Sequence, residues 1–79
     1  MFFNLKEKYI LNEKINDINI NLENNYKDLA ISAYNDFAKT LEEMKQNGLN
    51  EKVYNKYKKI LDDFTKRMEG YSHRDFYHS

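Results

Sequence analysis

The chain has 79 residues with 13 basic and 13 acidic side chains, and it contains neither cysteine nor proline. Because the net charge is zero, no overall electrostatic field attracts the protein to nucleic acid or anionic lipid. The lack of cysteine excludes disulfides, thiolate metal sites and cysteine catalysis. The apolar runs are far shorter than the ~20 residues that span a bilayer. We therefore expect one small helical domain of residues 1–79, in the cytoplasm and without a membrane segment.

Residues 1–21 carry many large apolar side chains in a pattern that is hard to interpret. Phe2 to Leu11 fit part of a short helix, whereas Ile18 to Leu22 alternate with period two, as in a strand. Several asparagines between residues 12 and 25 lower the helix propensity. We predict a short helix followed by an irregular or extended approach, packed on the rest of the chain.

Residues 22–47 show the periodicity of a long amphipathic helix. Its apolar side chains cover an arc of roughly 200° at the helical angular step, about twice the stripe that a single neighbour requires. This helix should therefore contact two partners. The surplus part of the arc is a candidate interaction face, which could be covered by residues 1–21, by a second copy or by a foreign protein. It comprises Ile31, Tyr34, Ala38 and Leu41.

The segment 47–50 predicts a tight turn between two antiparallel helices. Gly48 suits the left-handed position after a helix C-terminus, and Leu49 can then contact the last turn in a Schellman motif. Asn50 is a good N-cap for the following helix. Because the link is so short, the two helices must lie side by side.

Residues 51–69 predict the second helix of this hairpin, with an apolar arc of only about 120° and Gly70 as its end. The resulting fold class is all-α. It consists of an antiparallel hairpin of about 22–47 and 51–69, with a helical or irregular N-terminal segment packed on it. Two architectures satisfy this pattern, a three-helix bundle and a dimeric four-helix bundle.

The tail, residues 70–79, holds both histidines. His73, Asp75 and His78 are of metal-ligating type, but residues five apart diverge by about 140° on a helix, so we predict no metal site. A capped terminal turn is the preferred interpretation. The alternative is a docking tail, because aromatic residues and arginine are common at interface hot spots. Its candidate residues are Tyr71, Arg74, Phe76 and Tyr77.

One basic cluster interleaves with tyrosines and consists of Lys52, Lys56, Lys58 and Lys59. Lysines on phosphates and tyrosines stacked on bases would suit single-stranded nucleic acid. However, Tyr54 and Tyr57 lie on the apolar arc and most of the lysines point elsewhere. We interpret the lysines as a solvated face and keep nucleic-acid binding as the alternative function.

The sequence offers no set of residues for catalysis and no cofactor motif. The adjacent acidic pairs Asp62-Asp63 and Glu42-Glu43 diverge on their helices, and no glycine-rich phosphate loop or zinc-helix motif is present. We expect a non-enzymatic interaction module, such as an adaptor, regulator or inhibitor, whose partner is a protein or a second copy. The richness in Lys, Asn, Ile, Phe and Tyr suggests an A/T-rich genome of a bacterium or phage.

Overall fold

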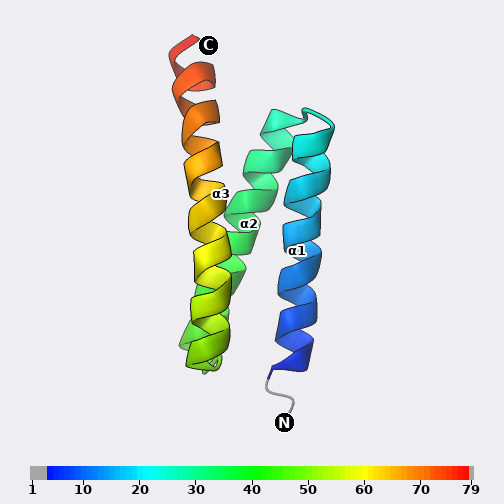
Figure 1. Cartoon of the computed structure of the whole chain (residues 1–79), viewed down its shortest axis with the longest axis vertical. Coiled ribbons are helices and arrows are strands. Elements are labelled where there is room, and N and C mark those ends of the chain that lie inside the picture. The colour runs from blue at the N-terminus through cyan, green and yellow to red at the C-terminus, as the bar shows by residue number, and fades with distance from the viewer. Residues whose placement is uncertain (1–3, 79) are drawn as a thin grey trace.

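The computed structural model describes residues 4–78 of the chain, with side chains described for residues 4–69. It contains three α-helices, α1 (Leu5–Glu23), α2 (Lys27–Gln46) and α3 (Glu51–His78), and no strand within the described residues (Figure 1). The all-α prediction is confirmed, in the form of a small helical bundle. The chain passes up, down and up again along a molecule of 48 × 20 × 16 Å.

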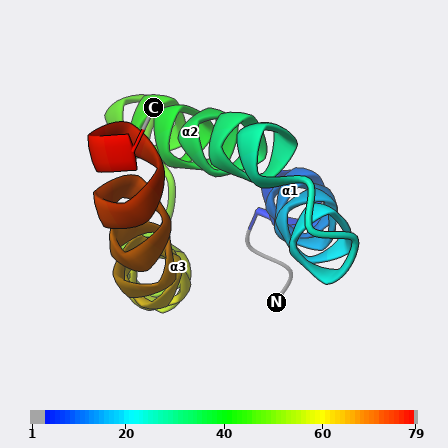
Figure 2. The same cartoon turned by 90° about the horizontal axis from the view of Figure 1, so that it is seen from above.

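Helix α2 is the centre of the arrangement. It packs against α1 on one side and against α3 on the other, whereas α1 and α3 make few direct contacts (Figure 2). The broad apolar arc predicted for this helix has the expected two neighbours. The prediction that the N-terminal segment packs on the long helix is also confirmed.

The core runs along the inner side of all three helices. The ring of Phe37 on α2 meets the ring of Phe64 on α3 edge to face, with centroids 6.4 Å apart, a geometry that aromatic quadrupoles favour. Every buried side-chain nitrogen and oxygen within residues 4–69 has a hydrogen-bond partner. The buried residues are Leu11, Ile18, Ala30, Phe37, Leu41, Leu49, Val53, Tyr57, Leu61, Phe64 and Met68.

The prediction for residues 12–21 was wrong, because this segment is helical throughout. Leu11, Ile15, Ile18 and Leu22 follow one another at steps of four, three and four, which aligns them on the α2 side of α1. Their burial offsets the low helix propensity of the asparagines. Asn21 and Asn24 also donate side-chain hydrogen bonds back to carbonyls one turn earlier, at 2.9 and 3.0 Å.

The predicted start of the long helix at residue 22 was wrong as well. Residues 22 and 23 belong to α1, and α2 begins only at Lys27. The chain reverses at Asn25, which has a φ of 58°. Asparagine is one of the few residues other than glycine that adopts this left-handed conformation readily. A turn without glycine or proline left no strong signal in the sequence.

The turn at 47–50 has the predicted structure. Gly48 adopts a φ of 97°, the N–H of Leu49 donates to the carbonyl of Met44 at 2.9 Å, and that of Gly48 donates to Lys45 at 3.1 Å. These two bonds define a Schellman motif. The side-chain oxygen of Asn50 then accepts from the N–H groups of Lys52 and Val53 at 2.9 and 3.3 Å, which is the predicted N-cap.

Helix α3 is longer than predicted. It does not end at Gly70 but continues to His78, so the backbone of the expected tail belongs to this helix. Glycine costs a helix interior only about 1 kcal/mol relative to alanine, and it ends a helix only where the backbone turns left-handed. No proline follows Gly70 to force an end.

Candidate functional site

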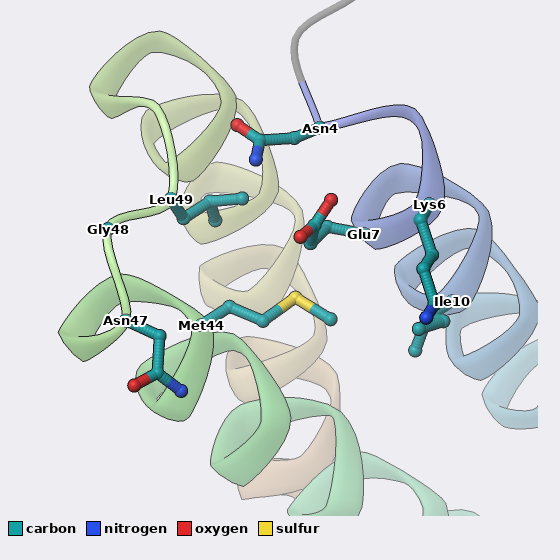
Figure 3. A pocket seen from close by; sticks show the side chains of 8 residues that line it. All are labelled: Asn4, Lys6, Glu7, Ile10, Met44, Asn47, Gly48 and Leu49. Carbon is teal, nitrogen blue, oxygen red and sulfur yellow. The ribbon is translucent and has the colours of Figure 1, made fainter.

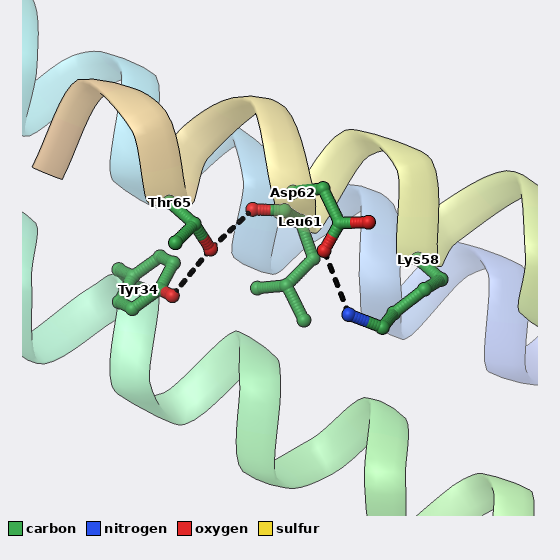
Figure 4. A network of polar contacts seen from close by, with 5 residues as sticks. All are labelled: Tyr34, Lys58, Leu61, Asp62 and Thr65. Atoms are coloured by element: carbon green, nitrogen blue, oxygen red, sulfur yellow. Dashed lines mark hydrogen bonds and ion pairs between the residues drawn. The ribbon is translucent and has the colours of Figure 1, made fainter. Parts of the chain in front are cut away.

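The candidate interaction face on α2 lies toward α3. Leu41 is only 1% exposed and belongs to the core, while Ile31, Tyr34 and Ala38 are partly buried and pack against that core. The hydroxyl of Tyr34 is 2.6 Å from Oγ1 of Thr65 on α3 (Figure 4). Much of this face is therefore covered within the chain, and its binding to a partner stays a prediction.

The contact between Tyr34 and Thr65 has a defined polarity. Oγ1 of Thr65 donates its single hydrogen to the carbonyl of Leu61 one turn earlier, at 2.9 Å. The hydroxyl of Tyr34 must then be the donor to Thr65. This short chain of hydrogen bonds, which Figure 4 shows, fixes the register of α2 against α3.

Among residues 4–69, the most exposed large apolar side chains lie elsewhere, on α1, at the α1–α2 turn and in the first turn of α2. Leu5, Tyr9, Ile20, Tyr26 and Leu29 are between 45% and 67% exposed. We call them the exposed apolar set. Tyr9 and Ile20 are eleven residues apart, which returns to nearly the same side of a helix, and this side is opposite the buried Leu11 and Ile18.

The sequence contained a signal for this surface. Tyr9, Ile10 and Leu11 are consecutive, and consecutive residues on a helix point about 100° apart. A run of three apolar residues therefore cannot face a single neighbour. In the structure Leu11 is buried, Ile10 is half-buried and Tyr9 is exposed.

Two of the four lysines in the α3 cluster contact neighbouring side chains. Nζ of Lys58 is 2.7 Å from the carboxylate of Asp62 (Figure 4), and this hydrogen bond raises the pKa of Lys58. Nζ of Lys56 lies 5.5 Å from the ring centroid of Tyr57. Lys52 and Lys59 are exposed.

The tyrosines between these lysines are poorly placed to stack on bases. Tyr57 is 1% exposed, and Tyr54 is half-buried with Nζ of Lys45 lying 4.6 Å from its ring centroid. Base stacking requires an open aromatic face. Nucleic-acid binding through this cluster stays a prediction that no described contact favours, and a titration with single-stranded oligonucleotides at low salt checks it.

Tyr57 has a structural role that the sequence did not indicate. Its hydroxyl donates to the side-chain oxygen of Asn12 at 2.8 Å, across the gap between α3 and α1. Burial raises the pKa of Tyr57 above its ordinary value, since the charged phenolate is disfavoured away from water. This hydrogen bond is one of the few direct links between α1 and α3.

A hollow of about 240 Å³ lies where the start of α1 meets the α2–α3 turn (Figure 3). The side-chain oxygen of Asn4 accepts from the N–H of Asn50 at 3.0 Å beside it. Ligand pockets usually measure at least about 300 Å³. The hollow is lined by Asn4, Lys6, Glu7, Ile10, Met44, Asn47, Gly48 and Leu49.

A second hollow of about 310 Å³ lies beside the α2–α3 turn and is lined by Lys45, Leu49, Glu51, Tyr54 and Asn55.

Within the described residues, no three histidine or acidic side chains lie close enough to hold a metal ion. Glu42, Glu43, Asp62 and Asp63 are all exposed. Neither hollow is lined by a catalytic nucleophile together with a general base.

The tail candidates lie outside the described side chains. The backbone of Tyr71, Arg74, Phe76 and Tyr77 is part of α3, so the docking prediction now concerns the last turns of a helix. The rejected metal ligands His73, Asp75 and His78 share this segment. No helix in the described part of the chain has the length and apolarity needed to cross a membrane.

Comparison with known proteins gave no match to a protein-family model, to a curated protein or to a solved structure.

Proposed function

We propose that this chain is a small helical protein-interaction module that acts by binding another protein and catalyses no reaction. The observation that carries the proposal is the exposed apolar set, Leu5, Tyr9, Ile20, Tyr26 and Leu29, whose members are all at least 45% exposed. Single exposed apolar residues are common on protein surfaces. Here four of the five fall in pairs at helical spacing, Leu5 with Tyr9 and Tyr26 with Leu29, and Ile20 lies on the same side of α1 as Tyr9.

These pairs suit recognition of a groove on a partner. A helix that docks into an apolar groove does so through residues at steps of three, four or seven, and Leu5 and Tyr9 on α1 have a step of four. Tyrosine contributes a large contact area at low entropic cost, and it is common among the residues that dominate binding energy. Glu13 and Asn16 are exposed polar residues that lie between Tyr9 and Ile20 on the same side of α1, so polar groups accompany the apolar ones, as is common in interfaces.

Site-specific photo-crosslinking in the source cell tests the proposal. A photoreactive phenylalanine analogue at Tyr9 or at Tyr26 should form a covalent adduct with a defined partner. The same analogue at Glu42, an exposed position on α2, is the matched control and should give no such adduct.

The purified partner then provides the quantitative test. Tyr9→Gln should weaken its binding by 2 kcal/mol or more if Tyr9 is a hot spot, about a thirtyfold loss of affinity, whereas Glu42→Gln should leave it unchanged. Equal cross-linking at all three positions, or equal binding by both variants, would contradict the proposal.

A further inference from the structure

The α1–α2 turn contains nothing that prevents α1 and α2 from joining into one helix. Residues 22–30, with the sequence LENNYKDLA, include neither glycine nor proline. The reversal depends on two residues, Asn25 at a φ of 58° and Tyr26 at a non-helical φ of -88° and ψ of 79°, and on the packing of α1 against α2. A straight helix through residues 24–26 would satisfy the same backbone groups with ordinary helical hydrogen bonds.

Straightening this turn would separate α1 from α2 of its own chain. In the structure Lys14 on α1 forms an ion pair with Asp36 on α2, and in one continuous helix these residues would be about 33 Å apart. The separation would also expose Leu11 and Ile18, which are now fully buried. These side chains need an equivalent surface to cover them.

A second copy of the chain provides that surface with the correct register. Lys14 lies eleven residues before Asn25, and Asp36 lies eleven residues after it. Two straightened helices placed antiparallel, with Asn25 facing Asn25, therefore bring Lys14 of each copy to Asp36 of the other. The burial of Leu11 and Ile18 against α2 is restored twice, once on each side of a two-fold axis.

The contacts between α1 and α3 are restored in the same way. Helix α3 follows its own α2 through the well-defined turn at 47–50, so it keeps its place on α2. The hydrogen bonds of Asn12 with Tyr57 and of Asn4 with Asn50 would then form between copies. Exchange of an identical element preserves native contacts, which makes it a low-cost route to a dimer.

We propose that two copies of this chain exchange α1, with residues 24–26 straightening so that α1 and α2 form one helix of residues 5–46 in each copy. The partner at this interface is a second copy of the chain, which offers the same register as the intramolecular contact. The proposal does not depend on the exposed apolar set, because the exchange reuses the buried side of α1.

Sedimentation equilibrium of hinge variants tests the exchange. The double variant Asn24→Ala/Asn25→Ala favours helix and disfavours a positive φ, so the dimer dissociation constant should fall at least about tenfold. Asn25→Gly favours the turn and should raise the dimer dissociation constant. Asn16→Ala replaces an exposed asparagine within α1 and should leave it unchanged, since α1 is helical in both states. A monomer for all variants at every concentration, or equal shifts for Asn16→Ala, would overturn the proposal.

Cross-linking distinguishes exchange from side-by-side association. The natural chain has no cysteine, so a short bismaleimide reacts only with thiols that are introduced. A mixture of Lys14→Cys and Asp36→Cys chains should give a covalent heterodimer, and a mixture of Lys14→Cys with Glu42→Cys should give none. Dimers without the first cross-link would refute the exchange.

Two controls complete the design. Circular dichroism verifies that each variant remains helical. If the double variant does not fold, cross-linking in the natural background and the Asn25→Gly variant still decide the question. Tyr9→Gln should leave the dimer dissociation constant unchanged, so failure of the exchange and failure of the proposed partner surface give different results.

Discussion

The two turns of this protein have the same backbone hydrogen bonds and differ in the residues that support them. In the α1–α2 turn the N–H of Tyr26 donates to Asn21 at 2.8 Å and that of Asn25 to Leu22 at 3.1 Å. In the α2–α3 turn the N–H of Leu49 donates to Met44 at 2.9 Å and that of Gly48 to Lys45 at 3.1 Å. Both are Schellman motifs.

The differences begin at the left-handed residue and continue after it. Gly48 has no Cβ to restrict a positive φ, whereas Asn25 adopts a positive φ at a higher cost than glycine does. Leu49, which follows Gly48, is 9% exposed, whereas Tyr26, which follows Asn25, is 55% exposed. Asn50 caps α3 through its side chain, whereas α2 begins without a side-chain cap.

The comparison shows how local and tertiary stabilisation are divided in this chain. The α2–α3 turn is supported by a glycine, a buried leucine and a capping asparagine that lie within three residues of one another. The α1–α2 turn lacks all three, so the packing of α1 on α2 must hold it in place. We therefore expect α1 to be the least stable helix of the bundle.

The largest predicted effect concerns a core residue of α1 and tests whether packing on α2 holds this helix in place. Leu11→Ala removes a fully buried side chain and should cost about 2–5 kcal/mol. Because the α1–α2 turn has little local support, the amides of α1 should exchange with solvent much faster, while those of α3 change little. Hydrogen exchange measured by NMR checks this.

Phe37→Ala is the control for that experiment. It removes the ring that packs on Phe64, at a cost of about 3–5 kcal/mol, and it should accelerate exchange in α2 and α3 as well. If Leu11→Ala accelerates exchange equally in all three helices, α1 is not an independent unit and the comparison fails.

The second prediction concerns Gly48. Apart from Gly48 and its two neighbours in the chain, no heavy atom lies within 4 Å of the position that a Cβ would occupy, so Gly48→Ala should cost only the conformational penalty of a positive φ, about 1–2 kcal/mol. Urea denaturation followed by circular dichroism measures it. Gly48→Asn reproduces the α1–α2 turn and should lose less. Equal losses for both variants would show that the left-handed backbone is not the source of the effect.

The third prediction concerns the cap of α3. Asn50→Ala leaves the N–H groups of Lys52 and Val53 without their side-chain acceptor, at a cost of about 1 kcal/mol. Asn50→Ser keeps an acceptor and should retain most of the stability. The two variants are compared by thermal unfolding, and an equal loss in both would point to a role of Asn50 other than capping.

The fourth prediction uses the pKa of Tyr57, which ties α1 to α3 independently of both turns. Because burial raises this pKa in the folded protein, the unfolded chain loses its proton first as the pH rises past about 10. The free energy of unfolding should therefore fall in this range. Tyr57→Phe should reduce this dependence, and Tyr54→Phe is the matched control. An unchanged pH profile in Tyr57→Phe would contradict the assignment.

The smallest predicted effect is at the α1–α2 turn itself. Asn25→Gly removes the remaining penalty of the left-handed conformation but increases the freedom of the unfolded chain, so the net gain should be a few tenths of a kcal/mol. Asn25→Ala should lose about 1 kcal/mol in the closed monomer. Urea denaturation at low protein concentration measures both, and a destabilised Asn25→Gly would mean that the Asn25 side chain itself supports the turn.

Sequence reasoning identified the α2–α3 turn correctly because every residue that builds it lies within a short segment. It failed at residues 12–21, where the low helix propensity of asparagine competed with an apolar stripe formed by Leu11, Ile15, Ile18 and Leu22. The segment is helical because α2 buries this stripe. Gly70 was assigned as a helix end from its type alone, whereas the backbone continues as a helix to His78.

The candidate sites were also predictable from the sequence only in part. The width of the apolar arc on α2 was visible in the sequence and correctly required two neighbours. The sequence did not show which side of α1 would face α2, because Tyr9, Ile10 and Leu11 are all apolar and point in different directions. The exposure of Tyr9 and the contact of Tyr57 with Asn12 depend on residues far apart in the chain.

The sequence by itself determined the helical class, the hairpin of α2 and α3 and the structure of the turn between them. These features arise from periodicity and capping, which act over one or two helical turns. Only the tertiary structure decided that residues 5–23 form one helix, that Asn25 reverses the chain and which apolar side chains remain in water. Those outcomes depend on the burial of side chains distant in sequence, where the free energy of packing exceeds the local preference of each residue.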